Sequence, residues 1–269
     1  MQPEFLITGA SGQLGRHLLA LLGERARGLD LPDIDITSPG SVKKAVERFQ
    51  PGCIINCAAI TDVDRCQREP LEAMAVHRDG VGHLAGTGIR LLTISTDHVF
   101  TGSCDTGRPF FEDDVPDPAN EYGRTKLMGE SLALEAGSDN IVVRTSWMFS
   151  ADRGLCTFIF NSLVNGGSVR AVRDQTACLT YAPDLAAAII ELAEGHGGGI
   201  YHLVNRPGTT PARLAERMAA ETGGSVIRVS WSDLDLDAPR PFYSELGTMR
   251  EIVLPDLDDA LERWRRSHE

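Results

Sequence analysis

The sequence predicts an α/β protein whose core is a doubly wound parallel sheet of the Rossmann type, followed by a smaller C-terminal lobe. Three observations predict this fold. A short apolar run, residues 5–8, leads directly into a glycine-rich turn and an apolar helix pattern. Strand and helix patterns then alternate along the first half of the chain, as in parallel sheets covered on both faces. After about residue 150 the elements shorten and their periodicity weakens.

Each expected element follows from a local pattern. Short runs of apolar and β-branched residues predict strands, and longer runs with apolar residues three or four apart predict helices. Crossovers of this length between parallel strands are right-handed, which places helices on both faces of the sheet. The expected strands are 5–8, 28–31, 53–57, 91–95, 141–145 and 200–204, and the expected helices are 14–22, 42–49, 71–86, 122–135, 157–165, 183–194 and 211–221.

The turn after the first strand indicates a dinucleotide site. Gly9 can make the tight turn, Gly12 lets the backbone approach a pyrophosphate, and Gly15 lets the helix pack closely on the strand. The N-terminus of the helix favours an anion. The spacing differs from G-x-G-x-x-G, and an ordinary strand, turn and helix is the alternative. Asp30, at the end of the second strand, stands where a ribose-binding carboxylate is expected and favours the cofactor reading.

Tyr122 and Lys126 are four residues apart, so on a helix they share one face. A phenol with a pKa near ~10 is a poor acid at neutral pH, and an adjacent cation lowers that pKa. Thr96, at the end of a strand, can hold the substrate oxygen to which Tyr122 gives its proton. The spacing alone is also typical of an exposed helix face. Together with the glycine-rich turn it predicts a hydride-transfer enzyme.

Other strand ends extend the predicted crevice, because ligands of doubly wound sheets bind beyond the carboxyl ends of the strands. Small residues at 57–59 let the adenosine side of a cofactor approach the backbone. Trp147, after the strand 141–145, either stacks on a sugar ring or is a half-buried core aromatic residue. Asp62 and Asp64, beside Arg65, suggest a helix cap or ion pairs more than a metal site.

Composition excludes several classes of function. The 269-residue chain is 42% hydrophobic and 24% charged, as in ordinary globular proteins. A net charge of -12 argues against binding to nucleic acid or to an anionic membrane. The first strand begins almost at Met1 and no apolar run can span a bilayer, so we expect neither a leader nor an anchor. Six cysteines without a C-x-x-C pair favour a reduced, cytoplasmic protein with no metal.

Short motifs spread over nearly the whole chain resemble a known family. They are GQLG at 12–15, DIDIT at 33–37, INCAAITDVD at 55–64, STDHVFTG at 95–102, YGRTKLMGE at 122–130, RTSW at 144–147, DQ at 174–175, GIYHL at 199–203 and RP at 240–241. In this order they resemble the dTDP-4-dehydrorhamnose reductase family. The resemblance is specific because many separate motifs agree.

The resemblance implies a fold and an activity. It implies an extended short-chain dehydrogenase/reductase that reduces the 4-keto group of a nucleotide-activated 6-deoxysugar, dTDP-linked, with NADPH or NADH. It also implies a monomer or a homodimer in which residues 1–150 and 181–205 form the dinucleotide-binding domain. A discontinuous substrate lobe would then comprise 151–180 and 206–269.

The residues and the resemblance together give three sets of site residues. Arg240 matches the substrate-phosphate segment of the family, where the bidentate geometry of arginine suits a diphosphate. The predicted catalytic residues are Thr96, Tyr122 and Lys126. The predicted substrate-binding residues are Asp97, His98, Trp147 and Arg240. The predicted cofactor-binding residues are Gly9, Ser11, Gly12, Gln13, Leu14, Gly15, Asp30, Asp35, Ile36, Thr37, Cys57, Ala58, Ala59, Thr61, Tyr122 and Lys126.

Four departures from the family pattern bear on the substrate. His98 stands where the family has Tyr, His77 where Asn is usual, and Leu179 where Pro is usual; Tyr243 lies near the place of an Asn. If all four lie around one cleft, the sugar differs from 4-dehydrorhamnose. We therefore expect a 4-ketoreductase for another nucleotide deoxysugar, as in the decoration of a natural product.

Two other classes of protein remain open from the sequence. One is a non-catalytic regulatory subunit that binds a dinucleotide, since such relatives can keep the catalytic residues. The other is a nucleotide-sugar epimerase or dehydratase, which needs an additional acid/base group beside Thr96. His98 is the one obvious candidate for that group.

Overall fold

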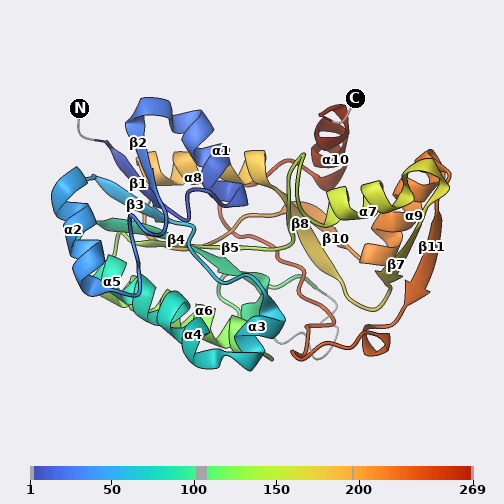
Figure 1. The fold of residues 1–269 in the computed structure, drawn as a ribbon, viewed down its shortest axis with the longest axis horizontal. Helices are drawn as coiled ribbons and strands as arrows, with labels where there is room; N and C mark the ends of the chain where they lie inside the picture. Colours follow the sequence, from blue (N-terminus) through green and yellow to red (C-terminus); the bar gives the residue numbers. More distant parts are fainter. Residues whose placement is uncertain (1–2, 101–107, 196, 268–269) are drawn as a thin grey trace.

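The computed structural model describes residues 3–100, 108–195 and 197–267 (Figure 1). Its centre is a six-stranded sheet in which every neighbouring pair of strands is parallel. In order across the sheet, the strands are β2 (Ala26–Leu29), β1 (Phe5–Thr8), β3 (Cys53–Asn56), β4 (Arg90–Thr96), β5 (Ile141–Thr145) and β9 (Gly199–His202).

Helices cover both faces of this sheet (Figure 1). Successive strand residues point to opposite faces, so Leu6 joins the core on one face and Ile7 the core on the other. The predicted doubly wound parallel sheet is therefore confirmed. One face carries α1 (Gln13–Leu22) and α8 (Ala182–Gly195), and the other carries α2 (Pro39–Phe49), α5 (Val81–Ala85) and α6 (Glu121–Ala136).

The strand order reverses beside β1, because β2 pairs with one side of β1 and β3 with the other. The loops that follow β1 and β3 therefore start next to each other. They approach so closely that a Cβ at Gly9, whose φ is +69°, would lie 2.6 Å from the backbone nitrogen of Ala58. Such a reversal opens the crevice in which doubly wound proteins bind ligands.

A second lobe has its own core, to which Phe149, Leu179 and Trp264 contribute. After β8 (Ala177–Tyr181), the chain returns through α8 and β9 to the parallel sheet. We propose that residues 1–150 with 181–205 form one domain and 151–180 with 206–269 the other. The second lobe comprises the strands β7 (Ser168–Val172), β8 (Ala177–Tyr181), β10 (Asn205–Thr209) and β11 (Ser225–Val229), and the helices α7 (Leu155–Leu163), α9 (Pro211–Thr222) and α10 (Leu257–Arg266). The short strand β6 (Met148–Phe149), at the end of the first segment, pairs with β8, and its Phe149 packs in the core of the second lobe.

The helix predicted over 71–86 is interrupted. It begins as α4 (Pro70–Met74), widens into the π-helical turn η2 (Ala75–Gly80) and ends as α5. The α6 helix packs tightly against this turn, since a Cβ at Gly129 would lie 2.1 Å from the carbonyl oxygen of His77. The remaining elements are α3 (Val63–Arg68) and the short 3-10 turns η1 (Gly23–Arg25), η3 (Asp97–Val99), η4 (Val164–Gly166) and η5 (Trp231–Asp233).

Candidate active site

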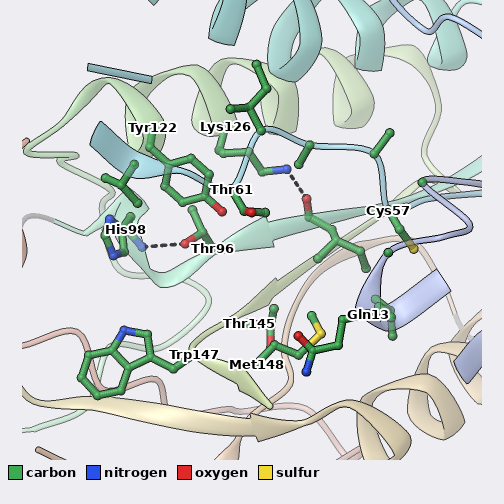
Figure 2. A pocket seen from close by; sticks show the side chains of 18 of the residues that line it. Gln13, Cys57, Thr61, Thr96, His98, Tyr122, Lys126, Thr145, Trp147 and Met148 are labelled. Carbon is green, nitrogen blue, oxygen red and sulfur yellow. Dashed lines mark hydrogen bonds between the residues drawn. The ribbon is translucent and has the colours of Figure 1, made fainter. Parts of the chain in front are cut away.

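A single cavity of about 1480 Å³ lies beyond the carboxyl ends of β1, β3, β4 and β5 and extends to the second lobe (Figure 2). Every residue that the sequence assigned to catalysis, to the cofactor or to the substrate lines this cavity. Segments far apart in the sequence therefore meet here, as the strand-end rule predicted. The separate roles of these residues remain predictions.

The glycine-rich turn and the first turn of α1 form one wall of the cavity. Gly12 precedes α1 and no side chain caps the helix, so the first backbone N–H groups are left for a ligand. A Cβ at Gly15 would lie 2.4 Å from the carbonyl oxygen of Gly9, so this position has no room for any side chain. A pyrophosphate fits this wall, since the uncapped N–H groups and the helix dipole attract an anion. Gln13 and Leu14 complete it.

Carboxylates lie beside this wall, where a dinucleotide would place its adenosine ribose. Asp30 follows β2, and its Oδ2 accepts a hydrogen bond from the backbone N–H of Ser11 at 2.7 Å. Asp35 accepts from both the backbone N–H and the hydroxyl of Thr37, at 2.9 and 2.7 Å. The facing wall comes from the loop after β3 and, with Ile36, consists of Cys57, Ala58, Ala59 and Thr61.

The middle of the cavity holds Tyr122, Lys126 and Thr96 (Figure 2). Tyr122 and Lys126 project from α6, and the phenol points towards the Thr96 hydroxyl at the end of β4. The Lys126 Nζ donates a hydrogen bond to the carbonyl oxygen of Ile94 at 2.5 Å. Asn120 fixes the start of α6, because its Oδ1 accepts from the backbone N–H of Gly123 at 2.8 Å.

The electrostatics of this group differ from the prediction in one respect. Burial raises the pKa of the Tyr122 phenol, and a hydrogen bond with Thr96 opposes that rise only in part. The Lys126 Nζ bonds the Ile94 carbonyl and makes no hydrogen bond to the phenol, so burial, more than the cation, sets the pKa of the phenol in the free site. Burial lowers the pKa of Lys126 to about 8. At neutral pH the phenol therefore keeps its proton and the lysine its charge.

His98 lines the cavity next to this group (Figure 2). Its ring meets the Tyr122 ring edge-on, with the two centroids 5.5 Å apart. Its backbone N–H donates to Thr96 Oγ1 at 3.2 Å. Burial is the main cause that lowers the pKa of the imidazole, so the ring is neutral at pH 7.

His77 does not line the cavity but braces its wall from behind. Its Nε2 accepts the backbone N–H of Ile60 at 3.0 Å, so the ring proton is on Nδ1 and bonds Thr125 Oγ1 at 2.9 Å. Burial lowers the pKa of His77 to about 3, which keeps the ring neutral. His77 thus ties the Ile60 loop to the helix that carries Tyr122.

The prediction that four departures surround one cleft is wrong for three of them. His77 lies behind the wall, and Leu179 is fully buried in the core of the second lobe. Tyr243 lies outside the cavity lining, and its hydroxyl donates to Glu245 Oε2 at 3.2 Å. Of these four positions, only His98 lines the cavity and can carry the expected change of substrate.

The predicted substrate residues have unexpected partners. Arg240 makes a bidentate ion pair with Asp64 and lies over the ring of Trp231, with its Cζ 5.3 Å from the ring centroid. This pair confirms the structural interpretation of Asp64, while Asp62 caps α3. The Asp97 carboxylate accepts from the Ser244 hydroxyl at 2.5 Å.

Sequence reasoning missed several residues of the distal wall. Arg170 on β7 is exposed, lines the cavity and has no hydrogen-bond or ion-pair partner among the described residues. Its only sequence signal is alternation, since it lies between the buried Val169 and Ala171. Other missed lining residues are Arg153, Phe158, Gln175 and Trp231.

Comparison with known proteins decides the family. A family model described as the RmlD substrate binding domain matches residues 3–267. The dTDP-4-dehydrorhamnose reductase of Streptomyces griseus is 38% identical, over 93% of this chain and 87% of that protein. The chain belongs to the dTDP-4-dehydrorhamnose reductase family. A second relative, the dTDP-4-keto-6-deoxy-D-glucose reductase of Streptomyces niveus, is 35% identical over 92% of this chain and 89% of its own length.

Solved structures of the reductase family share the fold. The dTDP-4-dehydrorhamnose reductase of Bacillus anthracis, solved in complex with NADP, superposes with a TM-score of 0.89 at 28% identity, over 99% of each chain. The family resemblance and the class of enzyme are thereby confirmed. The chain is an NAD(P)H-dependent oxidoreductase of the extended short-chain dehydrogenase/reductase type.

Proposed function

We propose that this chain reduces the C4 carbonyl of a dTDP-linked 4-keto-6-deoxysugar with NADPH or NADH. The observation that carries the proposal is the meeting of Tyr122, Thr96 and Lys126 in one cavity, between a phosphate-binding wall and a second, partly aromatic wall. The relatives named above act on dTDP-sugars of this kind, which supports the choice of substrate class.

Each of the three residues has a proposed task. NADPH or NADH, held between the glycine-rich turn and the loop after β3, would supply a hydride for the carbonyl carbon. The Thr96 and Tyr122 hydroxyls hold the carbonyl oxygen, and the Tyr122 proton passes to that oxygen as its negative charge develops. The Lys126 ammonium, 6% exposed, stabilises the phenolate that Tyr122 becomes and contacts the nicotinamide ribose. A proton from solvent then restores the phenol.

The second lobe is proposed to bind the rest of the nucleotide sugar. Trp147 presents its ring to the cavity and is placed to stack on the sugar (Figure 2). Arg240 already neutralises Asp64, so the unpaired Arg170 is better able to bind the diphosphate. Asp97 accepts the hydroxyls of Thr96 and Ser244 in the free site, and the Thr96 hydroxyl turns from Asp97 to the carbonyl oxygen when the sugar binds.

An assay panel tests this function. The purified chain is mixed with NADPH or NADH and with dTDP-linked 4-keto-6-deoxysugars that differ at C3 and C5, 4-dehydrorhamnose included. We expect oxidation of the cofactor and a product with a hydroxyl at C4. Cofactor binding without turnover of any sugar would favour a regulatory subunit. Epimerised or dehydrated product without net cofactor oxidation would favour the other alternative.

Cofactor preference gives a further prediction. Asp30 leaves one carboxylate oxygen for the ribose hydroxyls and would repel a 2′-phosphate, which favours NADH. Arg27 or Lys43 can fold towards that phosphate, so we expect use of both cofactors. Asp30→Asn should raise the NADPH-to-NADH ratio of kcat/KM by ~10-fold or more, since like charges ~4 Å apart repel by ~1–4 kcal/mol. Asp33→Asn is the control, because Asp33 is exposed outside the cavity lining. At least hundredfold tighter binding of NADPH by the wild type would contradict this role for Asp30.

We infer that the chain acts in the cytoplasm as a monomer or a homodimer. No described helix combines the length and hydrophobicity needed to cross a membrane. The five described cysteines are free thiols, as in reducing compartments. Sedimentation with and without NADPH measures the assembly, and a trimer or larger would contradict it.

A further inference from the structure

We propose that His98 selects the sugar, by donating a hydrogen bond from its Nε2–H to the hydroxyl on C3, next to the reacting carbonyl. This inference rests on the proposed function and names the feature of the substrate that the site requires. Four properties of the imidazole support it: its tautomer, the absence of a partner for its Nε2 among the described residues, the fixed position of the ring, and its place beside Thr96 and Tyr122.

Asn120 sets the tautomer of the ring. Asn120 Oδ1 accepts the backbone N–H of Gly123 at 2.8 Å, so the amide nitrogen is the atom that faces His98. That nitrogen donates to the carbonyl oxygen of Pro239 at 2.8 Å and to His98 Nδ1 at 3.1 Å. Nδ1 therefore accepts, and in a neutral ring the proton is on Nε2.

The Nε2–H group is open to the cavity. His98 is 6% exposed, and its Nε2 has no hydrogen-bond partner among the described residues. Among the described residues, the Ser146 hydroxyl oxygen is the one polar side-chain atom that has no hydrogen-bond partner and is also completely buried, so the unpartnered Nε2 of His98 is not completely buried. The Nε2 atom is therefore in contact with the cavity space, and a ligand acceptor can reach it. Buried donors rarely stay without a partner, so this nitrogen points to a ligand.

The position of the ring is fixed. A Cβ at Gly123 would lie 2.0 Å from the carbonyl oxygen of His98, so α6 packs directly on this backbone. The contacts to Asn120 and to the edge of Tyr122 hold the side chain as well. A rigid donor discriminates between ligands more sharply than a mobile one, because it cannot turn away from a missing acceptor.

The position relative to the carbonyl identifies the sugar hydroxyl. His98 borders both Thr96 and Tyr122, the two residues proposed to hold the C4 oxygen. In a 4-keto-6-deoxysugar, C4 is bonded to C3, which carries a hydroxyl, and to C5, which carries a methyl group and the ring oxygen. The hydroxyl closest to the carbonyl is therefore the one on C3. A phenol at position 98, as in the family pattern, would project farther into this space.

The experiment compares two sugars and three variants. The sugars are a dTDP-4-keto-6-deoxysugar with its C3 hydroxyl and the matched 3-deoxy analogue. His98→Phe keeps a ring against Tyr122 but removes the donor, and His98→Gln keeps an N–H near the place of Nε2. His83→Phe is the control, since His83 is half-buried outside the cavity lining. NADPH binding reports folding of each variant.

We expect His98→Phe to lower kcat/KM for the hydroxylated sugar by ~10–100-fold and to leave the 3-deoxy sugar nearly unchanged, because only the former loses a partner. His98→Gln should keep most of the discrimination and the pH profile of the wild type, since burial lowers the pKa of His98. Equal losses on both sugars in His98→Phe, or unchanged discrimination between them, would contradict this inference but not the proposed function. If the wild type reduced neither sugar, both the proposed function and this inference would be contradicted.

Discussion

Replacing Tyr122 by phenylalanine should lower turnover by ~10²-fold or more, the usual scale for loss of a general acid. The variant keeps the ring between His77 and His98, whose centroids lie 5.6 and 5.5 Å from that of Tyr122, so the wall keeps its shape. NADPH affinity should stay almost unchanged, because the hydroxyl lies beside Thr96, while the phosphate-binding turn is a separate wall of the cavity. Stopped-flow measurement of a single turnover separates the chemical step from binding.

Tyr201→Phe is the matched control for this change. The Tyr201 hydroxyl donates to the carbonyl oxygen of Gly197 at 2.8 Å, outside the cavity lining, so its loss should not affect turnover. Full activity of Tyr122→Phe would remove Tyr122 from the chemistry. A large loss of NADPH affinity in that variant would instead assign the hydroxyl to the cofactor.

The parts of the site that the sequence predicted depend on short-range patterns. The glycine-rich turn follows its strand directly, and the spacing of Tyr122 and Lys126 is fixed by a single helix. Thr96 could be added because the carboxyl ends of parallel strands meet at one edge of a sheet. The strands 5–8 and 141–145 were likewise predicted with the bounds that the structure has.

The parts that the sequence did not predict depend on contacts between distant residues. Arg240 and Asp64 are 176 positions apart, so no local pattern shows that the arginine is already paired. The π-helical turn lies where α6 packs against His77, and an unbroken helical periodicity in the sequence gives no sign of it. The tautomer of His98 is set by Asn120, 22 positions away. The pairing of charges and the direction of hydrogen bonds in the cavity could therefore be deduced only from the three-dimensional structure.

Arg144→Met should destabilise the chain by ~3–5 kcal/mol, the usual cost of leaving one member of a buried ion pair alone. The Arg144 guanidinium makes three hydrogen bonds of 2.7–3.2 Å to the carboxylate of Glu130, and both side chains are almost completely buried. Methionine fills much of the space but supplies no donor. Among the residues that the structure describes, the hydroxyl of Ser95 and the nearby Lys126 charge would then be left to face the carboxylate.

Urea unfolding measures this loss, with Arg124→Met as the control. Arg124 pairs with Glu121 on the same helix, but its side chain is 58% exposed, so its removal should cost less than ~1 kcal/mol. The double variant Arg144→Met/Glu130→Leu should recover part of the stability, because no unpaired carboxylate remains. Equal stability of Arg144→Met and the wild type would show that the buried ion pair does not stabilise the fold. Glu130 also raises the pKa of Lys126. Without this carboxylate Lys126 loses its proton at a lower pH, so the activity of the double variant should fall at a lower pH than that of the wild type.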